Sequence, residues 1–131
     1  MRLLLDTHVL IWLMEANPKL SDHLVGTLRD MENELLVSIG SVWEIAIKCG
    51  IGKMRLKTSY ERFLETAIKD YGINLLPVTE LDCLECYKLP FFKSNHKDPF
   101  DRMIISQAIR NSLTVVSADE AFDAYPVRRI W

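Results

Sequence analysis

The strongest constraint on the fold is an alternation of short, mostly apolar segments with longer segments of helical spacing. The short segments have the length of strands and cover residues 3–5, 35–37, 73–76, 113–116 and 127–130. Strands that are apolar on both faces belong to parallel sheets with helices on both sides. We therefore predict a three-layer α/β/α sandwich with a mostly parallel sheet, built as a single domain of residues 1–131.

Capping residues and periodic apolar positions predict the helices between these strands. Helices are expected to begin near Thr7, Ser21, Gly40, Ser59, Thr79 and Asp98, with a short helical turn at 119–122. An irregular basic stretch at 89–97 precedes the helix that Asp98 and Pro99 open. Right-handed crossovers bring the strand-to-helix turns to the carboxyl edge of the sheet, where open α/β folds bind ligands.

Composition excludes some classes of function without selecting one. The 16 Lys and Arg stand against 18 Asp and Glu, so nucleic acid would have to be attracted by a local patch. The apolar start is interrupted by Asp6 and is too short to span a membrane, which predicts no membrane association. Three cysteines indicate reduced thiols and a cytoplasmic protein, and the pair Cys83 and Cys86 has no second pair with which to bind a metal.

Four acidic residues, spread along the chain, share a position at or just inside a predicted helix start: Asp6, Glu44, Asp101 and Asp119. The predicted topology brings all four to the carboxyl edge of the sheet. Crowded carboxylates need a cation, and oxygen ligands suit Mg²⁺ or Mn²⁺. A site of this kind without a nucleophilic triad predicts a metal-dependent phosphodiesterase, and we favour one that cuts RNA.

Each acid also has a purely structural interpretation. Asp6 and Asp98 could be N-caps, and Asp119 lies favourably near a helix start. Ser41 and Glu44 fit a capping box, and Glu44 could pair with Lys48 four residues on. Caps need not converge, however, whereas the predicted topology makes these acids do so.

Other polar residues near the acids have candidate roles. Thr7 and Ser117 could orient a bound water, although helix capping is the simpler role for both. Lys97 and Arg102 belong to a basic group just around Asp101 and could guide an RNA backbone. A solvated loop, or an ion pair of Arg102 with a neighbouring acid, would explain them equally well.

Several segments resemble a known family: residues 3–8 (LLLDTH), 41–48 (SVWEIAIK), 98–102 (DPFDR) and 117–119 (SAD), together with Trp131. In this order and spacing they are similar to PIN-domain proteins of the VapC toxin type, over the whole chain. The resemblance implies about five parallel strands, Mg²⁺- or Mn²⁺-dependent endoribonuclease activity, a homodimer and neutralisation by a cognate antitoxin.

The resemblance also assigns roles to single residues. Asp6, Glu44 and Asp101 match the metal-binding acids of the family, and Asp119 matches a fourth, less indispensable one. Ser117 stands where Thr is common. The stretch 91–97 is slightly longer than usual for the family, so the resemblance assigns no substrate contact there.

Two other hypotheses compete with the nuclease. One is a non-catalytic protein-binding module of the same fold, whose acids only cap helices. The other is a phosphatase with Asp6 as nucleophile, which ranks last because His8 stands where its partner acid would be expected. The sequence does not identify the RNA that would be cut, the antitoxin or the number of metal ions.

Overall fold

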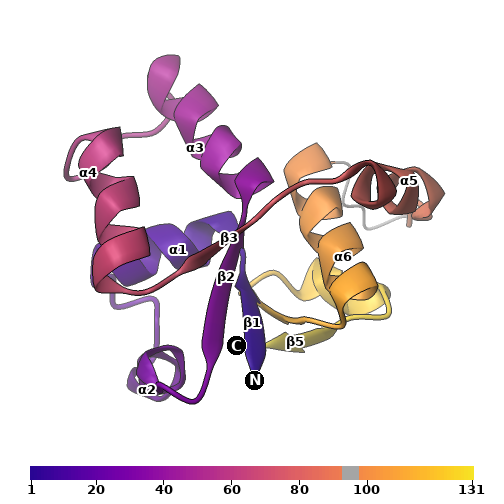
Figure 1. Ribbon diagram of the computed structural model, residues 1–131, viewed down its shortest axis with the longest axis horizontal. Helices are drawn as coiled ribbons and strands as arrows, with labels where there is room; N and C mark the ends of the chain where they lie inside the picture. The colour runs from indigo at the N-terminus through magenta and orange to yellow at the C-terminus, as the bar shows by residue number, and fades with distance from the viewer. Residues whose placement is uncertain (93–97) are drawn as a thin grey trace.

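The computed structural model describes residues 1–92 and 98–131, and its centre is a parallel sheet (Figure 1). Five strands pair in the order β3-β2-β1-β4-β5, and all four pairings are parallel. The strands are β1 (Arg2–Leu5), β2 (Glu34–Ser38), β3 (Asn74–Leu76), β4 (Thr114–Val116) and β5 (Arg128–Ile130). This confirms the predicted fold class, and the parallel strand directions give the sheet one carboxyl edge.

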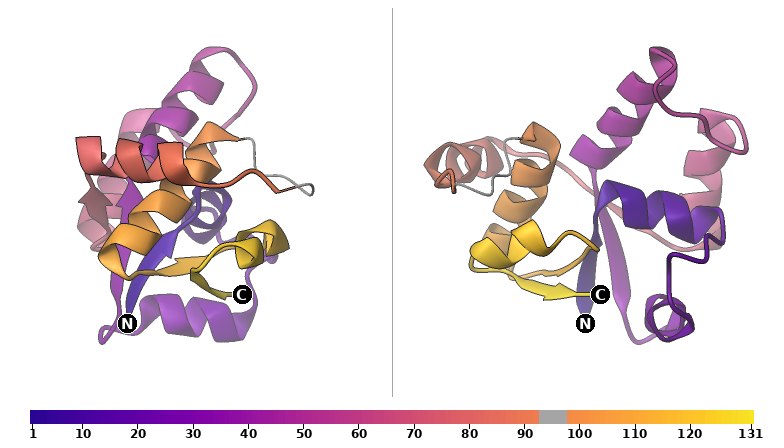
Figure 2. Two further views of the ribbon diagram at one scale, coloured as in Figure 1. Left: turned by 90° about the vertical axis from the view of Figure 1, so that its right-hand side faces the viewer. Right: turned by 180° about the vertical axis from the view of Figure 1, so that it is seen from behind.

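Helices cover both faces of the sheet, which makes the three layers visible in Figures 1 and 2. Helices α1, α2 and α4 lie on one side, α5 and α6 lie on the other, and α3 rises from the end of β2. Their bounds are α1 (Thr7–Met14), α2 (Asp22–Arg29), α3 (Ile39–Gly50), α4 (Tyr60–Glu65), α5 (Glu80–Lys88) and α6 (Pro99–Asn111). A π-helical turn, η1 (Thr66–Asp70), continues α4, and a 3₁₀ turn, η2 (Glu120–Ala124), follows β4. Within the described residues, none of these helices has the length and apolar character needed to cross a membrane.

Local side-chain bonds explain where most helices begin. The caps of α1, α2, α3, α4, α5, α6 and η2 each accept a backbone N–H within the first turn of the helix, which satisfies one otherwise unpaired donor. These caps are Asp6, Ser21, Ser38, Ser59, Thr79, Asp98 and Asp119. At the other end of η1, Gly72 adopts a positive φ of 63°, a conformation that a glycine adopts without strain.

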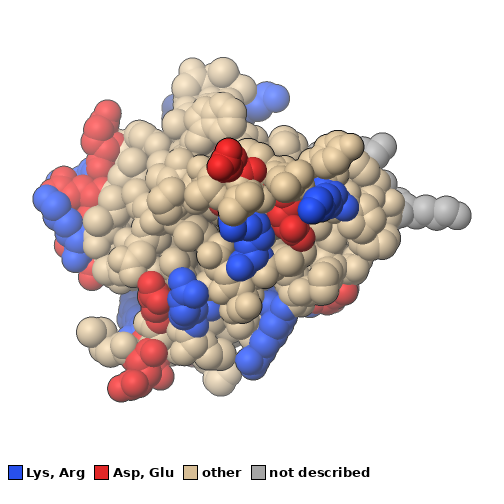
Figure 3. Space-filling view, turned by 45° about the vertical axis from the view of Figure 1, so that its right-hand side comes forward, with Lys and Arg blue, Asp and Glu red and all other residues tan. Residues whose placement is uncertain are grey.

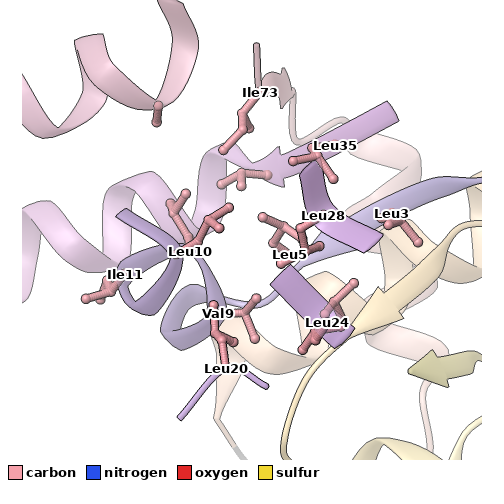
Figure 4. Packing of buried hydrophobic residues seen from close by; sticks show 14 of the residues in the cluster. Leu3, Leu5, Val9, Leu10, Ile11, Leu20, Leu24, Leu28, Leu35 and Ile73 are labelled. Atoms are coloured by element: carbon pink, nitrogen blue, oxygen red, sulfur yellow. The ribbon is translucent and has the colours of Figure 1, made fainter. Parts of the chain in front are cut away.

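The core has two parts because the sheet separates the helices on its two faces, and β1 contributes side chains to both parts. Leu3 and Leu5 point to the face of α1 and α2, whereas Leu4 points to the face of α6. All three are fully buried, so each contributes roughly 1.5–3 kcal/mol of hydrophobic stabilisation. Figure 4 shows Leu5 facing Leu28 of α2 in the first of these clusters. This packing fixes the direction of β1 and hence the place where Asp6 leaves the sheet.

Candidate active site

Asp6 lies at the carboxyl end of β1, where the chain turns into α1. Its backbone N–H donates to the carbonyl of Val116 at 3.1 Å, so β4 fixes the position of the residue. Oδ1 accepts the N–H of Val9 at 2.8 Å, and Oδ2 accepts the hydroxyl of Ser117. The residue is only 7% exposed, and burial raises the pKa of its carboxyl despite these hydrogen bonds and the nearby His8. A carboxylate that burial makes hard to ionise gains from a nearby cation.

Glu44, in the second turn of α3, is also buried and has a partner on each oxygen. Oε1 accepts the hydroxyl of Thr7 at 2.6 Å, and Oε2 accepts the ammonium of Lys48 at 2.6 Å. Thr7 is the residue next to Asp6 and belongs to α1. Through Thr7, the starts of α1 and α3 are therefore held together at the carboxyl edge.

Ser117 connects Asp6 with Asp119 across the next strand. Its hydroxyl donates to Asp6 and accepts the backbone N–H of Asp119 at 3.0 Å. The Asp119 side chain is exposed and caps η2, where Oδ1 accepts the N–H of Ala121 at 2.9 Å. Asp119 thus stands at the same edge as Asp6, with one oxygen used by the local cap.

Asp98 and Asp101 lie at the start of α6, a helix that packs against α3. Asp98 caps the helix through Oδ1, which accepts the N–H groups of Phe100 at 2.8 Å and Asp101 at 3.0 Å. Asp101 is half-buried in the first turn. The bond to Glu44 raises the pKa of Lys48 most, and the charges of Asp98 and Asp101 raise it further. The beginning of α6 therefore lies within electrostatic reach of Lys48 and of the Glu44 that it binds.

Arg102 has a structural environment that its position in the sequence did not predict. It is 5% exposed, and its guanidinium donates to the carbonyls of Leu89 at 2.8 Å, Pro90 at 3.1 Å and Cys86 at 3.3 Å. These contacts hold the end of α5 against α6, and they speak against a direct contact with RNA. Its proposed companion in RNA binding, Lys97, lies outside the described residues.

The residues at this edge fit a hard divalent cation in type but are not assembled around one. Within residues 1–92 and 98–131, no three His, Cys, Asp or Glu side chains are close enough together to hold one metal ion. The available donors are carboxylate and hydroxyl oxygens, which Mg²⁺ and Mn²⁺ prefer. On the Glu44 face of α3, the hydroxyl of Ser41 is buried and bonds to none of the described residues. Holding one ion in common would require these carboxylates to lie closer together than they do here.

The capping box predicted at Ser41 and Glu44 is wrong. Ser38 caps α3 by accepting the N–H of Gly40 at 3.0 Å, so the helix begins before Ser41. Ser38 is the last residue of β2 and directly follows its apolar residues 35–37, which is the signal that would have identified it. The i,i+4 pair of Glu44 with Lys48 that the sequence suggested is present. The nearness of Lys48 to the acids of α6 depends on tertiary packing, for which the sequence has no local signal.

On the face drawn in Figure 3, Lys and Arg residues are interspersed with Asp and Glu residues. The coloured residues of this face therefore form no continuous basic patch. A hollow of about 620 Å³ lies at the opposite, amino edge of the sheet, between residues 28–35 and 70–74. Neither feature includes the acids described above. We call the carboxyl edge of the sheet with Asp6, Glu44, Asp101 and Asp119 the acid edge, and it remains the candidate active site.

Comparison with known proteins gives one family. A family model described as PIN domain matches residues 3–127, which is nearly the whole chain. No curated protein sequence matches the chain significantly. The fold is similar to those of several solved structures at 16–20% sequence identity, a level at which the likeness concerns the fold alone.

Three of these structures cover almost the entire length of both chains. VapBC2 from Rickettsia felis, bound to a DNA fragment from its promoter, has a TM-score of 0.69 at 16% identity and covers 99% of this chain and 98% of its own. FitAcB from Neisseria gonorrhoeae has a TM-score of 0.68 at 20% identity, with coverage of 98% and 96%. DNA-bound VapBC from Salmonella typhimurium has a TM-score of 0.66 at 18% identity, with coverage of 99% and 97%.

Proposed function

Because the chain belongs to the PIN-domain family, we propose that it is a divalent-metal-dependent endoribonuclease and the toxin of a toxin–antitoxin pair. Membership of the family supports nuclease chemistry, and the similarity to VapBC and FitAB structures supports the toxin–antitoxin context. The observation that carries the proposal is the pair of buried carboxylates, Asp6 and Glu44, at one edge of the sheet.

In the proposed mechanism, Asp6, Glu44 and Asp101 hold Mg²⁺ or Mn²⁺, and Asp119 completes the set. When bound, the ion supplies activation of water and stabilisation of the charge that develops on the phosphate. Thr7 and Ser117 hold the Glu44 and Asp6 carboxylates in place through their hydroxyl groups. Both hydroxyl-bearing residues are buried, so these bonds are shielded from competing water.

The proposed partners follow from the same comparison. We expect a cognate antitoxin, because the similar folds occur in VapBC and FitAB structures. The toxin itself is proposed to be a cytoplasmic homodimer, with residues 1–131 forming one nuclease domain in each copy.

Asp6→Asn tests the nuclease proposal most directly. Asn caps helices about as well as Asp, so the variant should fold, but it removes a metal-binding charge. Purified wild type should cut RNA in Mg²⁺ or Mn²⁺ and stop when the ion is chelated. The variant should lose at least about 100-fold in cleavage rate, as expected when the stabilisation supplied by a metal is lost.

Asp22→Asn is the matched control. Asp22 lies in the first turn of α2, a helix that does not contribute to the acid edge, so this variant should cleave like wild type. Cleavage by Asp6→Asn at the wild-type rate would end the proposal.

A non-catalytic binding module is the second candidate function, and a specific observation favours it. Asp6, Asp98 and Asp119 all cap helices, and Glu44 is paired with Lys48. In this case the acids need no ion, and Mg²⁺ should not raise the melting temperature of the wild type. A rise that is absent from Asp6→Asn would favour the nuclease.

A further inference from the structure

The ion pair of Lys48 with Glu44 differs from an ordinary pair on a helix surface. The two charges lie 2.6 Å apart, and the Glu44 side chain is only 6% exposed whereas that of Lys48 is 34% exposed. A second pair with the same i,i+4 spacing, Glu65 and Lys69, is separated by 3.1 Å, and both of its side chains are mostly exposed. Exposed pairs of this kind contribute little, whereas a buried carboxylate depends strongly on its counter-charge.

Lys48 also serves more than one carboxylate. Helix α3 packs against α6, and Asp98 and Asp101 at the start of α6 act electrostatically on the Lys48 ammonium. The same ammonium donates directly to Glu44. The Lys48 ammonium therefore bonds to Glu44 and lies within electrostatic reach of two further acids at the start of α6, in the region where the proposed function requires a divalent ion.

The second oxygen of Glu44 has no charged partner among the described residues, so the carboxylate still depends on Lys48 for its counter-charge. Oε1 already accepts the hydroxyl of Thr7, which brings no charge. Two cations close to one carboxylate repel each other, and this repulsion is strong where burial lowers the effective dielectric. Lys48 and a divalent ion are therefore competitors for Glu44.

We propose that Lys48 is the resident counter-ion of the acid edge, and that a divalent ion binds Glu44 by displacing the Lys48 ammonium. This inference rests on the proposed metal-dependent function and adds an exchange step to it. The exchange explains why the acids share one edge while no three of the described ligating side chains form a ready metal group. It involves no covalent change, since one cation leaves the carboxylate as another arrives.

Binding of Mn²⁺ to the full chain without RNA tests the exchange. Titration calorimetry should show about tenfold tighter binding by Lys48→Gln than by wild type, equivalent to about 1.4 kcal/mol, because the competing charge is gone. Without metal, Lys48→Gln should melt at a lower temperature than wild type, and Mn²⁺ should raise its Tm by more. Lys48→Arg keeps the charge and should bind Mn²⁺ no more tightly than wild type.

Two controls locate the effect. Lys69→Gln removes the exposed pair of the same spacing and should leave the affinity for Mn²⁺ unchanged. Asp6→Asn should weaken binding, which assigns the titrated ion to the acid edge. Equal or weaker binding by Lys48→Gln, with wild type binding normally, would overturn the exchange and leave the nuclease proposal standing. Absence of binding in wild type would overturn both.

Lysine labelling of wild-type protein gives a second readout that needs no variant at position 48. Amine-reactive labelling followed by mass spectrometry should find Lys48 protected without metal and several-fold more reactive in Mg²⁺. Lys69, in the same sample, should react equally in both conditions. Unchanged protection of Lys48 at a saturating Mg²⁺ concentration would contradict displacement.

Discussion

At the scale of single residues, the buried carboxylates of this protein differ in what neutralises them. Burial raises the pKa of Asp6, and the described donors to its carboxyl are the uncharged N–H of Val9 and hydroxyl of Ser117. Asp82 in α5 is buried as well, and burial alone would raise its pKa. Bonds from Thr79 and Arg110 outweigh burial and lower the pKa of Asp82. Asp82 is therefore neutralised by a cation of the chain itself, whereas for Asp6 we propose a bound metal ion.

Asp82→Asn is expected to reduce the free energy of unfolding by about 1.5–3 kcal/mol at neutral pH. The carboxylate accepts the Thr79 N–H at 2.9 Å and an Arg110 N–H at 2.6 Å. Because its pKa is lower in the folded state, its contribution is full above the ordinary value of 3.8 and is lost as pH falls through the folded value. Urea unfolding at a series of pH values should show the gap between wild type and variant closing in acid.

Asp22→Asn serves as the control, because Asp22 is exposed at the start of α2. It should change stability by less than about 1 kcal/mol. A gap between wild type and Asp82→Asn that persists unchanged in acid would contradict the role of the charge.

A capping-box motif in the sequence predicts a real cap only where the helix begins directly after the Ser or Thr of that motif. The pattern Ser/Thr-x-x-acid occurs at Ser41 and again at Thr79. Only Thr79 and Asp82 form the reciprocal capping box, because α3 already begins after Ser38. A four-residue motif carries too little information to locate a helix start unless the preceding strand is also considered.

At the scale of elements, the start of α6 combines a proposed metal ligand, Asp101, with a structural residue, Arg102. Asp101 lies toward the acid edge, and the adjacent Arg102 turns inward to the end of α5. The guanidinium also lies 3.9 Å from the ring centroid of Phe91, a favourable cation–π distance. Arg102 therefore connects α5 to the helix that presents Asp101.

Arg102→Met should destabilise the protein by about 3 kcal/mol, because buried carbonyls at the end of α5 lose a charged donor. Hydrogen exchange should show faster opening of α5, and urea unfolding should show the loss in stability. Arg128→Met, in the exposed first position of β5, should leave both measurements close to wild type. Normal protection of α5 in Arg102→Met would contradict this assignment.

The order and type of most elements could be predicted because apolar periodicity and caps are local signals. Within residues 1–92 and 98–131, the five strands and six α-helices lie where the sequence predicted them, with ends shifted by a few residues. The π-helical turn after Glu65 was not predicted, since no residue type distinguishes it from an α-helical continuation. The inward direction of Arg102 was also missed, although Ile105 and Ser106, three and four residues later, are both buried.

At the scale of the whole molecule, the parallel sheet topology could be predicted from the sequence. The hydrogen bonds of the acids at the carboxyl edge of the sheet could not. Parallel strands bring Asp6 and Asp119 to one edge as expected, and α3 and α6 bring Glu44 and Asp101 toward it. Which oxygen accepts from Thr7, Lys48 or Ser117 depends on how helices far apart in the sequence pack together. A single sequence contains no direct signal for such contacts, so the present partners of the acids appear only in three dimensions.

The proposed homodimer can be tested at an apolar groove between α3, α5 and α6. The groove has a volume of about 450 Å³ and is lined by Ile39, Gly40, Trp43, Val78, Cys86, Pro99, Phe100 and Met103. Trp43 is 62% exposed, which is unusual for so large an apolar side chain at a groove. Trp43→Glu should convert a dimer into a monomer when mass is measured by light scattering during gel filtration.

Met31→Glu is the matched control for the dimer. Met31 is 96% exposed and lies at the opposite edge of the sheet, so this variant should keep the wild-type mass. A monomeric wild type would contradict the homodimer. A Trp43→Glu variant that stays dimeric would show that the interface lies outside this groove.

The central position of β1 has a consequence for how the protein is made. Of the strands in this sheet, β1 is translated first and lies in the middle, and the later strands are added outward on both sides. Asp101 and Asp119 are translated long after Asp6, so a nascent chain holds only part of the acid set until α6 and η2 have emerged. Under the proposed activity, a nascent chain cannot cut RNA before the segments that carry Asp101 and Asp119 have been made.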